Sequence, residues 1–242
     1  MVPFAALQNN QGKHLIEQHT ISSAPSIQTL ALTHEKSKST QSGKSPIVVG
    51  NPTMPMWEGT QLENLDGAEK EAISIAKLFN IQAITGNQAT KSVVLKQMQN
   101  ASIVHLATHG LLDNVQGDIP GAIALAPSGN DTGFLTSNEI FDLKLNANMV
   151  VLSACDTGRG KITGDGVVGL SRSFIAAGVP SVVVSLWAVD DDSTALLMGD
   201  FYRNLKTNPN KAQALRNAML TTMKQHPSPK DWAAFTLVGE AE

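Results

Sequence analysis

Ala101-Ser-Ile-Val-His-Leu-Ala107 gives the clearest evidence for the fold of this chain. It is short, mostly apolar and partly β-branched, and Thr108-His109-Gly110 follows it directly. A second run of this kind, Met149-Val-Val-Leu-Ser-Ala154, leads into Cys155. Strands that are apolar on both faces are typical of a parallel sheet covered by helices on both sides. The two runs therefore predict central strands of such a sheet.

Helical segments separate the predicted strands along most of the chain, which is the pattern of an α/β protein. Apolar spacing predicts helices over residues 67–80, 91–99 and 167–177, from Asp192 or Ser193 onward, and after Asn208-Pro209. Further strands are predicted over residues 47–50, 81–84, 181–186 and 234–238. Residues 122–135 interrupt the alternation and predict an inserted β-hairpin. We therefore expect residues 1–242 to form a single α/β domain with a mostly parallel central sheet and helices on both faces.

The first 46 residues give a weaker pattern than the rest of the chain. Residues 15–20 alternate weakly, like an edge strand, and residues 33–46 are rich in Ser, Lys, Gly and Thr. The second composition predicts an exposed, flexible loop. The regular alternation of strands and helices is expected to begin after it, with the strand over residues 47–50.

Composition excludes several classes of protein. The 242 residues carry 18 Lys and Arg against 21 Asp and Glu, a net charge of −3, with no basic stripe that would suit nucleic acid. The longest apolar run, residues 182–189, is far shorter than the roughly 18 residues that a membrane helix needs. The single cysteine suits a reducing compartment, and the N-terminus lacks the features of a signal peptide. We therefore expect a cytoplasmic protein that binds neither nucleic acid nor membrane.

Reactive side chains follow three of the predicted strands. His109 and Cys155 follow the two runs quoted above, and Asp190 and Asp191 follow the strand over residues 181–186. The carboxyl ends of parallel strands meet at one edge of a sheet, where ligands bind. Neighbouring strands lie about 4.8 Å apart, so residues that follow adjacent or next-nearest strands can share a site. A histidine, a cysteine and an acidic pair are therefore predicted to lie together.

Each of these residues also has a purely structural interpretation. A lone cysteine is often a small buried hydrophobe, and an Asp at a helix start is usually a cap. Cys155, however, lies at the end of its strand, and the turn and helix beyond it favour a thiolate. Gly110, directly after His109, lets the backbone approach a ligand closely. Together these features favour a functional site.

The motifs around His109 and Cys155 resemble those of the CHAT domains, caspase-like proteins associated with TPR repeats. CHAT sequences typically read H-[LI]-A-T-H-G and L-S-A-C-x-T, and this chain has His105-Leu-Ala-Thr-His109-Gly110 and Leu152-Ser-Ala-Cys155-Asp-Thr157. The His-to-Cys spacing also matches the roughly 50 residues of caspases, although only the Ala-Cys pair of the caspase signature is kept. The resemblance extends to residues 2–7, 164–178, 185–191 and 232–235.

The resemblance implies a caspase-like three-layer sandwich and, since His109 and Cys155 are both kept, cysteine endopeptidase chemistry. In that chemistry Cys155 attacks the scissile carbonyl as a thiolate, and His109 supports the thiolate and protonates the leaving amine. The backbone N–H groups of Gly110 and Cys155 would hold the oxyanion. Neither a metal nor another cofactor is implied.

The resemblance also bears on specificity and partners. Separases read an arginine before the cleaved bond with an Asp in a W-x-V-x-D stretch, which matches Trp187-Ala-Val-Asp-Asp191. Asp191, with Asp190 second, is therefore the candidate for binding a basic substrate residue. The implied partners are a protein or peptide substrate and a TPR region or protein outside this chain. We accordingly expect the chain to be a fragment of a longer protein.

Other functions are supported less well by the residues. The main alternative is a caspase-fold module that keeps its His and Cys but acts only as a regulated interaction domain. Gly164-Asp-Gly166-Val-Val-Gly169 satisfies G-x-G-x-x-G, but in dinucleotide-binding folds the glycines follow the strand at once. His105 and His109 are spaced like metal ligands, but Leu106 stands where the zinc-protease motif needs Glu, and a third ligand is not evident.

Overall fold

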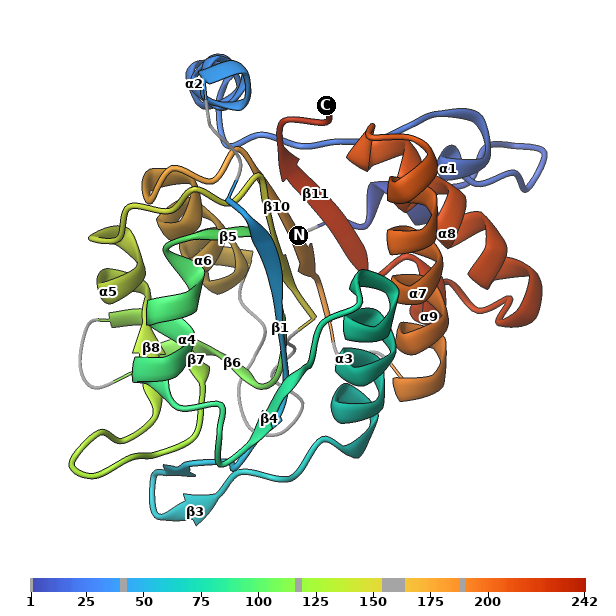
Figure 1. Ribbon diagram of the computed structural model, residues 1–242. Coiled ribbons are helices and arrows are strands. Elements are labelled where there is room, and N and C mark those ends of the chain that lie inside the picture. The colour runs from blue at the N-terminus through green and yellow to red at the C-terminus, as the bar shows by residue number, and fades with distance from the viewer. Residues whose placement is uncertain (1, 40–42, 116–118, 154–163, 188–189) are drawn as a thin grey trace.

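The computed structural model describes residues 2–39, 43–115, 119–153, 164–187 and 190–242. A six-stranded sheet runs through the centre of the molecule in the order β11-β10-β9-β5-β1-β4 (Figure 1). Five of its strands are parallel, and β11 pairs antiparallel with β10 at one edge. These strands are β1 (Ser45–Pro52), β4 (Ile84–Gly86), β5 (Ala101–Ala107), β9 (Met149–Leu152), β10 (Ser181–Ser185) and β11 (Phe235–Gly239). The prediction of a mostly parallel central sheet is confirmed.

Helices cover both faces of the sheet (Figure 1). One face carries α3 (Asp66–Phe79), α7 (Asp191–Thr207) and α8 (Lys211–Gln225), and the other carries α4 (Lys91–Met98), α5 (Ser137–Phe141) and α6 (Gly164–Ala176). Four shorter or peripheral helices are η1 (Phe4–Ala6), α1 (Leu15–Gln18), α2 (Ile27–Ser39) and α9 (Pro229–Trp232). The predicted three-layer α/β sandwich is therefore confirmed. In the described residues, no helix combines the length and the apolar character that crossing a bilayer requires.

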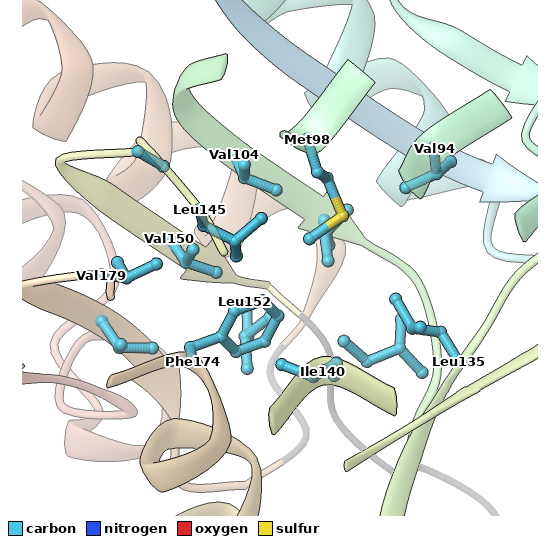
Figure 2. Packing of buried hydrophobic residues seen from close by; sticks show 14 of the residues in the cluster. Val94, Met98, Val104, Leu135, Ile140, Leu145, Val150, Leu152, Phe174 and Val179 are labelled. Carbon is cyan, nitrogen blue, oxygen red and sulfur yellow. The ribbon is translucent and has the colours of Figure 1, made fainter. Parts of the chain in front are cut away.

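Two cores form because successive side chains of a strand point to opposite faces. Val150 and Leu152 of β9 pack on the face of α4, α5 and α6, where they meet Phe174 (Figure 2). Val151, between them, packs on the face of α3, α7 and α8. Ser153 comes next in this alternation and belongs to the same face as Val151. The buried Glu71 of α3 lies on the same face.

The predicted insertion is a small antiparallel sheet. Its strands are β6 (Gly110–Val115), β7 (Ile119–Ala124) and β8 (Phe134–Thr136), and both neighbouring pairs are antiparallel. The hairpin predicted over residues 122–135 is thus confirmed, with β6 as a third strand. A separate two-stranded pair, β2 (Met56–Trp57) and β3 (Thr60–Gln61), precedes α3.

Side-chain caps explain where several helices begin. A cap supplies an oxygen to the first N–H groups of a helix, which have no partner within the helix. Helix α7 begins at Asp191, earlier than the Asp192 or Ser193 cap that the sequence predicts, because Asp190 is its cap. The capping side chains are Thr90 for α4, Thr136 for α5, Asp190 for α7 and Asn210 for α8.

Two predictions for the first 46 residues are wrong. The loop predicted over residues 33–46 includes the second half of α2 at its start and the first residues of β1 at its end. The edge strand predicted over residues 15–20 begins with the short helix α1. Helix α2 is exposed along most of its length, with Ile27 and Leu32 in solvent, so it has no apolar stripe of the usual strength.

Candidate functional site

Two adjacent parallel strands lead to the two candidate catalytic residues. In the register of β5 and β9, Leu106 pairs with Leu152. His109 comes three residues after Leu106, and Cys155 comes three residues after Leu152. Cys155 itself lies outside the described residues, so its position and that of its backbone N–H stay predictions. His109 and Cys155 therefore each lie three residues after the paired residues Leu106 and Leu152.

His109 is held firmly at the end of β5. Its residue is only 4% exposed, and its Nε2 lies 2.8 Å from the backbone oxygen of Glu63. A carbonyl oxygen can only accept, so Nε2 carries a proton and donates it to this bond. The backbone N–H of Ala124 donates to the His109 carbonyl at 2.9 Å, and the Thr108 hydroxyl donates to the Ala124 carbonyl at 2.8 Å. The imidazole therefore has a fixed orientation and a fixed tautomer, with Nδ1 available for proton transfer.

The carbonyl that orients His109 belongs to a segment that is itself fixed to the sheet. Asn51, at the end of β1, accepts the backbone N–H of Leu65 at 2.8 Å and donates to Glu69 Oε2 at 3.1 Å. Asn51 has φ 43°, in the left-handed region that Asn tolerates better than most residues. These two bonds hold the start of α3 against β1. They thereby fix the chain that carries the Glu63 carbonyl.

The two acidic candidates have different surroundings. Asp190 is the cap of α7: its Oδ1 accepts the backbone N–H groups of Asp192 and Ser193 at 3.1 and 3.4 Å. Asp191 is exposed, yet its carboxylate lies directly over Gly67 in the first turn of α3. A Cβ added to Gly67 would come within 2.0 Å of Asp191 Cγ, so the contact requires glycine. Gly67 lies four residues after Glu63, whose carbonyl orients His109, so the Asp191 carboxylate contacts the same short segment.

A buried polar network lies beneath this edge of the sheet, between β5, β9, α3 and α7. The Ser153 hydroxyl donates to Glu71 Oε2 at 3.1 Å, and Glu71 Oε1 lies 3.0 Å from His105 Nε2. His105 Nδ1 and the Tyr202 hydroxyl share a hydrogen bond of 3.0 Å. Burial, and secondly the Glu71 carboxylate, raise the pKa of Tyr202 well above its ordinary value, so the phenol stays protonated. Both ring nitrogens of His105 thus face protein groups, which leaves neither for a metal.

The structure brings some of the predicted site residues together. His109 and Asp191 lie at the same edge of the sheet, joined through the segment from Glu63 to Gly67. Gly110 is buried and begins β6, opposite Ile123. The role of its N–H as an oxyanion donor stays a prediction.

Sequence reasoning missed three groups of this edge: the Glu63 carbonyl, Asn51 and Glu71. A backbone carbonyl leaves no signal in a sequence. Glu71 left one, because it stands among apolar residues on the inner face of a predicted helix.

Solved structures of similar fold include a cysteine proteinase and a separase. The chain is similar to the Arg-specific cysteine proteinase gingipain R, with a TM-score of 0.58 and 11% identity, over 90% of this chain and 53% of that one. It is also similar to the Saccharomyces cerevisiae separase in a separase–securin complex, with a TM-score of 0.56 and 14% identity, over 91% of this chain and 14% of that one. At such identities the similarity shows the fold, which is that of the caspase-like proteases.

Relatives in sequence contain TPR repeats. The chain is 28% identical over 281 residues to tetratricopeptide repeat protein 28 of Mus musculus, covering 98% of this chain and 12% of the relative. The Homo sapiens protein of the same name is 28% identical over 282 residues, covering 99% of this chain and 11% of the relative. The chain thus spans about an eighth of the length of these relatives. The family model of the CHAT domain matches residues 1–240, so the chain belongs to the CHAT domain family.

Proposed function

We propose that this protein is a cysteine endopeptidase in which Cys155 and His109 hydrolyse peptide bonds. The observation that carries the proposal is the pairing of Leu106 with Leu152, since each candidate follows its strand at the same offset from this pair. Adjacent strands lie about 4.8 Å apart, which is a suitable separation for a thiol and an imidazole. The CHAT family and the protease folds similar to this chain add support.

The tautomer of His109 assigns a role to each ring nitrogen. Nε2 keeps its proton on the Glu63 carbonyl throughout, so Nδ1 is the atom that exchanges protons. Nδ1 takes the proton of Cys155, and the thiolate sulfur attacks the scissile carbonyl carbon. The N–H groups of Gly110 and Cys155 stabilise the resulting oxyanion. The C–N bond then breaks as Nδ1 returns its proton to the leaving amine, which leaves a thioester on Cys155.

Hydrolysis of the thioester completes the cycle. Nδ1 accepts a proton from water while the water oxygen attacks the thioester carbonyl. The C–S bond breaks, the carboxylic acid leaves, and the thiol is restored with its proton. The chain needs no metal or cofactor for these steps.

We propose further that the substrate has a basic residue before the cleaved bond. Asp191 supports this role best, because its carboxylate is exposed at the same edge as His109. Asp190 is second, since its side chain already accepts two backbone N–H groups of α7. A guanidinium or ammonium group of the substrate would form a charge-assisted hydrogen bond with such a carboxylate.

The partners proposed are a protein or peptide substrate and a TPR region or protein outside this chain. The TPR-containing relatives, of which the chain covers about an eighth, support the second. We propose that residues 1–242 form one domain, because both cores are built on the two faces of one sheet.

Alkylation of the single cysteine tests the pairing with His109. A free thiol has a pKa of about 8.5, so only about 1% of it is thiolate at pH 6.5. If His109 stabilises the thiolate, iodoacetamide should modify Cys155 at pH 6.5 at least ~10-fold faster in the wild-type protein than in His109→Ala. Intact-mass measurements read this rate without interference, since the chain has one cysteine.

The control is His19→Ala, which removes an exposed imidazole remote from β5 and should leave the rate unchanged. Cleavage of fluorogenic peptides ending in Arg or Lys is measured alongside, with Cys155→Ala as the inactive reference. Equal alkylation rates in wild type and His109→Ala, together with cleavage that survives Cys155→Ala or never occurs, would favour the interaction-module alternative.

A further inference from the structure

The buried network described above has a feature that packing alone does not explain. His105 is fully buried and Glu71 is 4% exposed, so a carboxylate and an imidazole face each other inside an apolar core. Their neighbours on this face are Val151 of β9, opposite His105 in the sheet, and partly buried Ile103 of β5. Groups of this kind are costly to remove from water.

The pair is also poorly satisfied. Glu71 Oε1 and His105 Nε2 lie 3.0 Å apart, yet neither atom makes a hydrogen bond of good geometry in the described structure. An apolar pair of similar volume would hold α3 on the sheet as well or better. The better-formed contact of Glu71 is the bond that its Oε2 accepts from the Ser153 hydroxyl at 3.1 Å. The network therefore points toward the end of β9.

Ser153 is the last described residue before Cys155 and stands two positions from it. Its side chain faces α3 because Val151, two residues earlier, does the same. A hydrogen bond at this position restrains the chain two residues before Cys155. His105, which shares a hydrogen bond with Tyr202, lies 3.0 Å from the other oxygen of Glu71.

One short segment thus holds both candidate strands. The Glu63 carbonyl orients the imidazole of His109 after β5, and the Glu71 carboxylate holds Ser153 after β9. Seven residues lie between Glu63 and Glu71, and five of them are in the first turns of α3. The segment from Glu63, just before α3, to Glu71, in its second turn, therefore contacts the ends of both strands.

We infer that Glu71 is a positioning residue for Cys155, acting through Ser153, with the buried His105 beside the other oxygen of its carboxylate. The inference rests on the proposed peptidase function and extends it to a group that does not touch the substrate. In this inference, the start of α3 and the segment before it set the separation of the imidazole and the thiol. A misplacement of about 1 Å between reacting groups can lower the rate of reaction about 100-fold.

The first test is Ser153→Ala, which removes the bond to Glu71 and leaves the Glu71–His105 pair in place. We expect kcat for peptide cleavage to fall ~10-fold or more, with KM nearly unchanged, because the substrate contacts remain. Ser153→Thr keeps the hydroxyl and should restore most of kcat. The matched control is Ser181→Ala, which removes a buried serine bond of 2.7 Å to the Glu240 carbonyl at the opposite end of the sheet.

The second test is a double-mutant cycle with Glu71→Leu. If Glu71 acts through Ser153, the double variant should lose no more kcat than the larger of the two single losses. Glu71→Leu leaves His105 without its carboxylate and can fail to fold. In that event Ser153→Ala and its threonine rescue decide the inference by themselves.

The outcomes separate this inference from the proposed function. Wild-type kcat in Ser153→Ala, while His109→Ala is inactive, overturns the positioning role and leaves the peptidase assignment intact. If Cys155 is alkylated at the same rate in the wild-type protein and in His109→Ala, the peptidase assignment is overturned, and the positioning role with it. A loss of kcat equal to that in Ser181→Ala shows a general effect of stability and also overturns the inference.

Discussion

At the scale of single residues, Asp191 offers the sharpest test of specificity. Asp190 is engaged in capping α7, whereas the Asp191 carboxylate is exposed beside the first turn of α3. A charge-assisted hydrogen bond to a substrate guanidinium contributes about 1.5–3 kcal/mol, or roughly 10- to 100-fold in kcat/KM. We therefore predict that Asp191→Asn lowers kcat/KM for peptides cleaved after Arg by roughly that factor. Peptides with an uncharged residue at that position should be cleaved as before.

Two neighbouring variants control for charge and helix stability. Asp192→Asn removes an equally exposed carboxylate from the first turn of α7 and should not change the preference. Asp190→Asn keeps a good capping side chain, so the stability of the helix should hold. If Asp191→Asn leaves the ratio of kcat/KM between Arg peptides and uncharged peptides unchanged, Asp191 does not bind the substrate. Its carboxylate then only stabilises the positive N-terminal ends of the helices beside it.

The predictability of the site differs from residue to residue. His109 and Asp191 could be proposed from sequence because residues that follow parallel strands converge at one edge, whatever the details of packing. The Glu63 carbonyl could not, since any residue carries one and the bond depends on how α3 approaches the sheet. Glu71 looked like an ordinary helical charge. Its place on the apolar face of α3 indicates burial, but its bonds to Ser153 and His105 depend on how α3 packs on β5 and β9, which no local pattern encodes.

At the scale of elements, Lys91 ties the antiparallel insertion to the main sandwich. Its Nζ lies 3.0 Å from Glu139 Oε1 and 3.1 Å from Asp131 Oδ2, and it donates to the Phe134 carbonyl at 3.2 Å. Burial lowers the pKa of Lys91, but the bonds to Glu139 and Asp131 outweigh it, so the pKa is raised overall. The ammonium therefore stays charged and holds β8 and α5 against the start of α4.

We predict that Lys91→Met lowers the free energy of unfolding by about 1–2 kcal/mol, because two carboxylates and a carbonyl lose their donor. For a chain of this size the melting temperature should fall by roughly 2–8 °C. Lys96→Met, on the exposed side of the same helix, is the matched control and should change little. A melting temperature equal to that of the control would mean that the apolar contacts of the insertion hold it without Lys91.

Elements differed in how far the sequence predicted them. The buried strands β5, β9 and β10 and helix α3 were predicted within a few residues, because each has a continuous apolar run or stripe. Helix α2 was not, since it is exposed along most of its length and its Ser, Thr and Lys residues match a loop in composition. Helix α2 contacts the rest of the molecule through single residues, such as the buried Thr33, and single contacts leave no periodic pattern in the sequence.

At the scale of the whole molecule, the two ends of the sequence are joined. The His34 Nδ1 of α2 lies 2.8 Å from Glu240 Oε2, just after β11, and the backbone N–H groups of Ala241 and Glu242 donate to Glu240 Oε1. Burial raises the pKa of Glu240, but the bonds from His34 and the two backbone groups outweigh it, so the pKa lies below its ordinary value. The ionised form of Glu240 is therefore favoured by folding.

This direction fixes how stability depends on pH. A carboxyl whose pKa is lower in the folded state stabilises the protein above its unfolded pKa, near 4.5, and loses this contribution as the pH falls through the folded value. Wild type should therefore melt above Glu240→Gln at pH 7, by roughly 1–3 °C for a partly screened pair. At an acid pH below the folded pKa of Glu240 the difference should vanish, because the protonated acid resembles the amide.

The exposed neighbour Glu35 supplies the matched control, since Glu35→Gln removes the same charge from α2 without touching the joined ends. Its melting temperature should follow that of wild type at both values of pH. A difference between wild type and Glu240→Gln that persists at the lower pH would show that the amide disturbs packing around β11. If the two proteins melt at the same temperature at pH 7, the His34–Glu240 contact does not stabilise the fold. Helix α2 is then held by other contacts, such as that of the buried Thr33.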